Sequence, residues 1–173
     1  MAALAPLRQQ PFWIQNGMRR VLIHAFVLTC LPWVTWWAWR MERRIVRGGR
    51  PLSKAESEAA RRVGVRHPER IRVAGVSRVP MPGVAWMHRT AARFGFDGSQ
   101  TSGMALRYGI FVKAGSEGDP QLLLHECVHT GQFERLGSLA GFLRRYLVEC
   151  LHDGYPNSSL EREARDRSLK SVA

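Results

Sequence analysis

Two histidines and a glutamate lie close enough in the sequence to bind and use a metal ion. His125, Glu126 and His129 form the pattern HExxH. Asp119 followed by Pro120 is a typical helix start, so the pattern is predicted to lie in the middle of a helix. Residues four apart share a helix face, about 6 Å apart at their bases, so the two imidazoles can bind one zinc ion. Glu126 points about 100° away around the helix axis and can act as a general base toward water at the metal.

A catalytic zinc site has three protein ligands, so a third must come from another part of the chain. Two acidic candidates, Glu161 and Glu163, fall on a predicted C-terminal helix whose inward face is defined by Leu160 and Ala164. Glu161 lies about 60° from Ala164 around the helix axis, and Glu163 about 100°. We therefore predict Glu161 as the third ligand. Ser158 and Glu161 also have the spacing of a capping box, which leaves a purely structural role open for Glu161.

The segment around these residues resembles the gluzincin-type zinc metallopeptidases, in which HExxH is followed by a separate helix that donates a glutamate. Residues 161–164 are similar to the ExxA pattern of the CAAX-processing membrane peptidases and of the zinc peptidases that cleave phage repressors. Gln132 makes the segment similar to small bacterial domains of the form HExxHxxQ. The resemblance covers residues 104–166. It departs at Arg165, where the membrane peptidases carry an aspartate that steadies a zinc-binding histidine, a role open here to Asp166 or Gln132.

The resemblance implies zinc-dependent hydrolysis of peptide bonds in a peptide or protein substrate. The metal ligands would be His125, His129 and Glu161, with Zn²⁺ as cofactor. Zinc lowers the pKa of a bound water, and Glu126 removes the proton of that water as the catalytic base. The alternative is a catalytically inactive zincin-like module that binds zinc or a protein partner at the membrane. The glutamate at position 126 argues against this alternative, because a binding-only site needs no general base.

The elements before the motif follow from local sequence signals. Ser53 and Glu56 have the spacing of a capping box, so a helix is predicted to begin there and to end near residue 63. Residues 70–73 alternate between arginine and an apolar residue, which predicts a short strand. Residues 84–94 follow a proline-rich turn and are predicted to form another helix.

The clearest strand signal spans residues 104–113, just before the motif. Apolar residues alternate over ten positions, which predicts one strand. In zincin-like folds an edge strand beside the active-site helix binds an extended peptide through main-chain hydrogen bonds, and this strand has the right position in the sequence. Gly109 would then let a substrate backbone approach closely. A central strand, with Gly109 at a tight packing site, is the alternative.

Three helices are predicted to complete the domain. The metal-binding helix ends at Gly137, the next begins after Ser138 and stops near Gly154, and the last carries residues 160–164. Together with the resemblance, these elements predict an α+β, zincin-like fold. It would consist of a small sheet with an active-site helix and a downstream ligand helix, preceded by an apolar N-terminal segment.

Residues 21–39 contain no charged side chain and have arginines on both sides. Nineteen uncharged residues can just span a bilayer, but the tryptophans of this segment favour the headgroup zone, so it can also lie in the interface. A buried core helix is the third reading.

We divide the chain into a membrane-associating segment, residues 1–47, and a zincin-like catalytic domain, residues 48–173. Five arginines in residues 40–50 exceed the three before residue 21, which predicts attachment to the bacterial inner membrane with the catalytic domain facing the cytoplasm.

The composition limits the other classes of function. The 26 Lys and Arg residues against 14 Asp and Glu give a net charge of +12, which can serve nucleic acid, an anionic membrane or an acidic substrate. The arginines are dispersed without a recognisable nucleic-acid-binding motif, so no nucleic-acid partner is expected.

Three widely spaced cysteines do not suggest a disulfide framework and favour a reducing compartment. Cys127 is expected to be a small buried apolar residue and no nucleophile.

Overall fold

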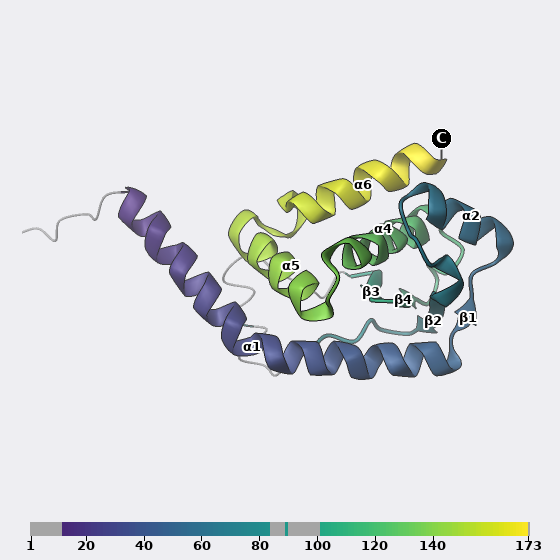
Figure 1. Cartoon of the computed structure of the whole chain (residues 1–173), viewed down its shortest axis with the longest axis horizontal. Coiled ribbons are helices and arrows are strands. Elements are labelled where there is room, and N and C mark those ends of the chain that lie inside the picture. Colours follow the sequence, from purple (N-terminus) through teal and green to yellow (C-terminus); the bar gives the residue numbers. More distant parts are fainter. Residues whose placement is uncertain (1–11, 84–88, 90–100, 173) are drawn as a thin grey trace, which may run out of the picture.

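The computed structural model describes residues 12–83, 89 and 101–172. This part of the chain is α+β, as predicted, with five α-helices and a mixed four-stranded sheet (Figure 1). The helices are α1 (Phe12–Gly48), α2 (Lys54–Arg62), α4 (Pro120–Leu136), α5 (Leu139–Asp153) and α6 (Ser159–Val172). The strands are β1 (Arg50–Pro51), β2 (Arg72–Val76), β3 (Gly103–Leu106) and β4 (Gly109–Lys113), and two short 3₁₀ helices are η1 (Pro68–Arg70) and η3 (Tyr155–Asn157).

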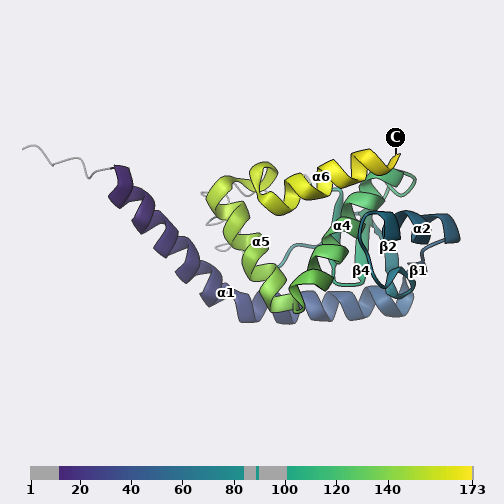
Figure 2. The ribbon, with the colours of Figure 1, turned by 45° about the horizontal axis from the view of Figure 1, so that its top comes forward.

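The sheet lies between α1 and the helices α4 and α6. Its strands are ordered β1, β2, β4, β3, with β2 and β4 parallel and the edge strands β1 and β3 antiparallel to their neighbours. α1 runs along one side of the sheet, while α4 and α6 lie on the other side in both views (Figures 1 and 2). α5 contacts both α1 and α4 and so connects the two layers.

The prediction of one strand over residues 104–113 is wrong, because this segment forms the hairpin of β3 and β4. Leu106 pairs with Gly109, so the turn has only two residues, and the first of them, Arg107, has a left-handed φ of 57°. Glycine or asparagine is the usual signal for such a turn, and neither is present. Alternation of apolar residues continues across a two-residue turn, which is why the pattern looked like one strand. The hairpin makes β3 an edge strand and places β4, with Gly109, inside the sheet.

Helix ends agree closely with the local signals. Asp119 accepts hydrogen bonds from two backbone N–H groups of the first turn of α4, and Gly137 ends that helix with a left-handed φ of 75°. Ser53 and Glu56 form the predicted capping box of α2. The helix predicted for residues 84–94 falls almost wholly outside the described residues.

α1 contributes one face to the core along most of its length. The buried side chains recur every three or four residues and are Ile23, Val27, Cys30, Val34, Ala38, Met41 and Ile45. From Cys30 onward this stripe belongs to the same apolar core as the sheet and α4. The helix bends near its middle (Figure 1), where Pro32 lies within it and removes a backbone hydrogen bond. The division of the chain after residue 47 stays a prediction.

The apolar N-terminal helix predicted from the sequence is present. Its part Gly17–Gly48 is 32 residues long and contains an 18-residue window of mean hydropathy 1.6, so it is long and apolar enough to cross a membrane. Core helices of soluble proteins and signal sequences meet the same criterion of length and composition. The criterion therefore does not choose among the three readings of this segment.

Candidate metal centre

The three predicted ligands meet where α4 faces the first turn of α6. The Nε2 atoms of His125 and His129 on α4 are 3.2 Å apart. One carboxylate oxygen of Glu161 on α6 lies 3.2 Å from Nε2 of His125, and the other lies 3.3 Å from Nε2 of His129. The three side chains thus present two imidazole nitrogens and a carboxylate to one point, a group that can hold a metal ion.

The donor set is buried on one side and open on the other. The side chains of His129 and Glu161 are 7% and 4% exposed, whereas that of His125 is 16% exposed. A cleft of about 450 Å³ reaches His125 and the neighbouring Glu126, between the start of β3, the first turn of α4, η3 and α6. A molecule that enters the cleft therefore approaches the donor set from the side of His125.

Glu126 lies beside the donor set and also contacts the edge strand β3. Its carboxylate accepts a hydrogen bond from the backbone N–H of Ala105. The side chain passes so close to β3 that a Cβ atom at Gly103 would lie 2.5 Å from its Oε1. Burial raises the pKa of Glu126, and the nearby imidazoles oppose this rise when they are charged. The position, at the wall of the cleft and next to the ligands, is the one a general base requires.

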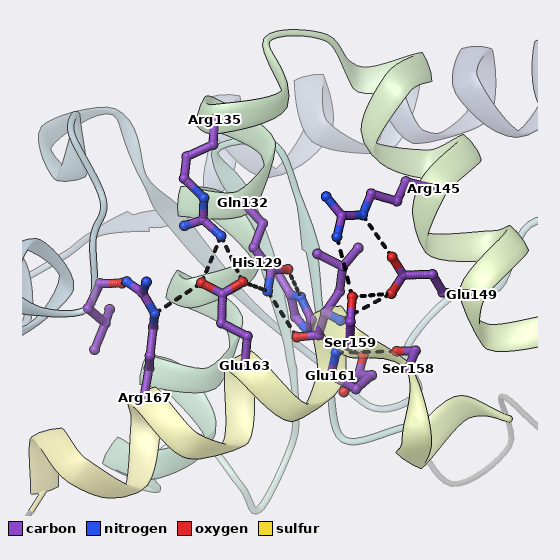
Figure 3. A network of polar contacts seen from close by, with 12 residues as sticks. His129, Gln132, Arg135, Arg145, Glu149, Ser158, Ser159, Glu161, Glu163 and Arg167 are labelled. Carbon is purple, nitrogen blue, oxygen red and sulfur yellow. Dashed lines mark hydrogen bonds and ion pairs between the residues drawn. The ribbon is translucent and has the colours of Figure 1, made fainter. Parts of the chain in front are cut away.

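A chain of hydrogen bonds fixes the ring of His129 from behind (Figure 3). Its Nδ1 lies 2.8 Å from Oε1 of Gln132, which has no donor on that atom, so Nδ1 donates this hydrogen bond and Nε2 is the ring nitrogen that faces His125 and Glu161. The amide nitrogen of Gln132 donates to the backbone oxygen of Leu160 at 2.9 Å and to Glu163 at 3.1 Å. Gln132 therefore takes the supporting role that the sequence left open between it and Asp166, which is exposed.

Glu163, the competing candidate for third ligand, points away from the donor set. Each of its two carboxylate oxygens accepts a hydrogen bond from Arg135 at 2.7 Å, and the carboxylate forms an ion pair with Arg167 at 3.0 Å (Figure 3). Two glutamates two residues apart on a helix point about 200° from each other, so only one can face the histidines. Glu163 instead connects two arginines to Gln132.

Groups from two helices hold Glu161 in place. The hydroxyl of Tyr146 on α5 donates a hydrogen bond to Oε1 of Glu161 at 2.6 Å. Ser158 caps α6 by accepting from the backbone N–H of Glu161 at 3.2 Å, and Glu149 on α5 accepts from the backbone N–H of Leu160 at 3.2 Å. The carboxylate of Glu161 turns toward the histidines and Tyr146, so it does not complete the capping box that Ser158 would allow.

The electrostatics of the centre favour a carboxylate facing imidazoles. Burial raises the pKa of Glu161, but hydrogen bonds with His125 and His129 outweigh it and hold that pKa far below its usual range. Burial likewise opposes protonation of His129, but the hydrogen bond and charge of Glu161 raise its pKa to about 9. Glu161 also lies in the first turn of α6, where the helix dipole stabilises a negative charge.

Tyr146 is the residue of the centre that the sequence did not reveal. The apolar stripe of α5 contains Tyr146, so its spacing indicated only that the ring is buried. In the structure the ring packs edge-on against His129, with centroids 5.7 Å apart, and its hydroxyl reaches Glu161. Burial raises the pKa of Tyr146 well above its usual value, so the hydroxyl stays a donor. Its position depends on how α5 packs against α4 and α6, which no local pattern encodes.

Two further residues near the centre have defined environments. Cys127 is fully buried, and burial raises the pKa of its thiol far above the usual range, in agreement with the expected apolar role. Arg165 lines the cleft and donates a hydrogen bond to the backbone oxygen of Pro156 in η3.

No family model, curated protein or solved structure matches this chain.

Proposed function

We propose that the protein is a zinc metallopeptidase with a zincin-like fold. The observation that carries this proposal is the close approach of the donor atoms: the two Nε2 atoms lie 3.2 Å apart, and they lie 3.2 and 3.3 Å from the two carboxylate oxygens of Glu161. Ligand atoms at about 2.0–2.1 Å from a tetrahedral zinc ion are about 3.3 Å from one another. The donor set therefore fits zinc in both spacing and chemical type, since two histidines and a glutamate are a familiar catalytic set.

In the proposed reaction the metal and the side chains have different roles. Zinc in such a site supplies Lewis acidity, which lowers the pKa of water and polarises a carbonyl group. Glu126, at the wall of the cleft, accepts the proton of the attacking water and can pass it to the leaving amine. Gln132 and Tyr146 hold His129 and Glu161 in orientation, so the donor set does not reorganise during the reaction.

The cleft supports a peptide as substrate. It runs along Thr101, Ser102 and Gly103 at the start of the edge strand β3, beside His125 and Glu126. A sheet edge can pair with an extended peptide through main-chain hydrogen bonds. Such pairing would bring a peptide carbonyl into the cleft on the open side of the donor set.

Metal analysis combined with an activity assay tests the proposal on the full-length protein. We expect one equivalent of zinc, and hydrolysis of a mixed peptide library that stops on chelation and returns when zinc is restored. Glu126→Gln should keep the zinc but lose hydrolysis, because the amide preserves shape and removes the base. Zinc binding with no hydrolysis of any library peptide would favour the alternative, an inactive zincin-like module. Absence of zinc would reject both.

We also propose that the protein attaches to the inner membrane of a bacterium, with the metal centre on the cytoplasmic side. The apolar α1 and the arginines after residue 39 support this location. A reporter fused after Ala173 should be active in the cytoplasm, and activity only in the periplasm would reverse the orientation.

A further inference from the structure

The face of α1 that points away from the sheet is apolar over most of its length. Its exposed large apolar side chains are Met18, Val21, Leu22, Leu28, Trp33, Trp36 and Trp39. They lie within about 140° of one another around the helix axis, opposite the buried stripe. The apolar surface continues into a groove of about 700 Å³ between α1 and the turn that joins α4 to α5. Soluble proteins rarely expose so large an apolar patch without a partner.

A group of exposed arginines follows directly on this face. We call Arg40, Arg43, Arg44 and Arg47 the arginine cluster. Within the described part of the chain, no carboxylate forms an ion pair with any of the four. Some arginines elsewhere, Arg50, Arg107 and Arg135, each pair with a glutamate. Four guanidinium groups on successive turns of one helix face are complementary to a surface of negative charge.

Tryptophans join the apolar face to the arginine cluster. The guanidinium of Arg40 lies 5.7 Å from the ring centre of Trp36, and that of Arg43 lies 4.7 Å from the ring centre of Trp39. Tryptophan rings concentrate at the headgroup level of a bilayer, where arginine can also reach lipid phosphates. The paired rings and guanidinium groups would therefore lie at the same depth in a bilayer, at the level of the headgroups.

The opposite face of α1 excludes a helix that crosses the bilayer. Its buried stripe packs on α5 and on the sheet, and near its end Glu42 is 6% exposed and pairs with Arg107 at 3.0 Å. At the other end, Arg19 donates to the backbone oxygen of Leu151 on α5 at 3.2 Å. A spanning helix would have to leave these contacts and place the charge of Glu42 next to the hydrocarbon.

We infer that α1 lies in the plane of an anionic membrane surface, with its apolar face inserted among the headgroups and the arginine cluster on lipid phosphates. The rest of the protein stays on the aqueous side. Residues 21–39 then lie in the membrane interface and do not span the bilayer, and the surface that they bind is one of anionic lipid.

The arrangement has a consequence that rests on the proposed peptidase function. α4 and α6, which carry the residues of the metal centre, lie on the side of the sheet away from α1 (Figures 1 and 2). A protein bound through α1 would hold the metal centre on the far side of the sheet from the bilayer. The substrate would then be a soluble chain or a segment outside the membrane, and no intramembrane peptide.

Vesicle binding of the full-length protein tests the inference. We expect binding to vesicles of phosphatidylglycerol and phosphatidylcholine in equal parts, weaker binding to phosphatidylcholine alone, and release by high salt. Replacing the arginine cluster by glutamine should weaken binding to the anionic vesicles at least tenfold. Trp36→Ser with Trp39→Ser should weaken binding to both kinds of vesicle. In cells, alkaline carbonate should release the protein from the membrane fraction.

A matched variant controls for net charge. Arg61, Arg62, Arg144 and Arg162 are also exposed and lie outside α1, and replacing all four by glutamine removes the same charge. This variant should bind anionic vesicles as the unaltered protein does. Glu126→Gln should also bind normally, so a failure of the peptidase proposal and a failure of the lipid proposal give different results.

Four outcomes would overturn the inference. Resistance to alkaline carbonate would show a spanning helix. Equal losses in the two arginine variants would show a nonspecific charge effect. Retention on duplex DNA without vesicle binding would assign the arginine cluster to nucleic acid. A dimer that the tryptophan substitutions dissociate, again without vesicle binding, would assign the apolar face to a second copy of the chain.

Discussion

Oε1 of Gln132 accepts a hydrogen bond from Nδ1 of His129 across 2.8 Å, from a position three residues further along the same helix. The pair lies on one face of α4, so the helix itself supplies both the proposed metal ligand and the group that fixes its ring. The other end of the amide reaches α6 through the backbone oxygen of Leu160. One buried side chain thus orients the ring of His129 on α4 and connects it to the helix that provides Glu161.

Gln132→Met should weaken zinc binding by roughly 10–100-fold, because it removes the acceptor that orients His129 while keeping similar volume. Competition with a chelator of known affinity measures the change. Melting of the metal-free protein separates a loss of ligand orientation from a loss of fold. Gln121→Met, at an exposed position in the first turn of the same helix, is the control and should leave zinc affinity unchanged.

Substitutions of the two glutamates of α6 distinguish a metal ligand from a partner in ion pairs. Glu161→Ala should release zinc at equilibrium, because a site with only two histidines remains. Glu163→Ala should keep one equivalent, since its carboxylate binds Arg135 and Arg167 and not the donor set. Zinc content measured on both variants decides the matter. Zinc kept without Glu161 but lost without Glu163 would reverse the assignment of the third ligand.

Local signals in the sequence were enough for the helix that carries the histidines. Asp119, Pro120 and Gly137 act within a few residues of themselves, and each behaves in the structure as its type predicts. The direction of Glu161 was also accessible, because Leu160 and Ala164 face the core and fix the rotation of α6. These inferences needed only the helical period.

Features that depend on packing between distant segments were not accessible in the same way. The turn at Arg107 carries no glycine or asparagine, and Thr130 on α4 donates to its backbone oxygen at 2.8 Å from 23 residues away. The contact of Tyr146 with Glu161 requires α5 and α6 to meet. The one-sided burial of α1 was hidden because its outward face is as apolar as its inward face.

Glu56 provides a test of stability away from the metal centre. Hydrogen bonds and charge from Arg50, with the backbone N–H of Ser53, lower the pKa of Glu56 from 4.5 to about 2 against the effect of burial. A lowered pKa in the folded state means that the stabilisation is complete above pH 4.5 and is lost as the pH falls toward 2. Glu56→Gln should therefore reduce the free energy of unfolding by about 1 kcal/mol at neutral pH.

Urea unfolding of this variant and the unaltered protein between neutral pH and pH 3 measures the difference, which should shrink toward the acid end. Zinc content should not change, because Glu56 lies on α2 and outside the donor set. A difference that grows toward acid pH would mean that the carboxylate is not stabilised in its charged form.

The contact between Gly103 and Glu126 predicts how a single methyl group can act on the proposed general base. A Cβ at position 103 would lie 2.5 Å from Oε1 of Glu126 and 2.9 Å from its Cδ, so Gly103→Ala must displace the carboxylate. The donor set is not in that contact, so zinc content should stay at one equivalent. Hydrolysis should fall at least tenfold, because a misplaced catalytic group loses its alignment with the water it deprotonates.

Gly118→Ala adds the same methyl group where nothing lies within 4 Å, and should keep full activity. Unchanged hydrolysis in the Gly103 variant would mean that Glu126 does not act from its position beside β3, whereas loss of zinc would show that β3 also supports the ligands.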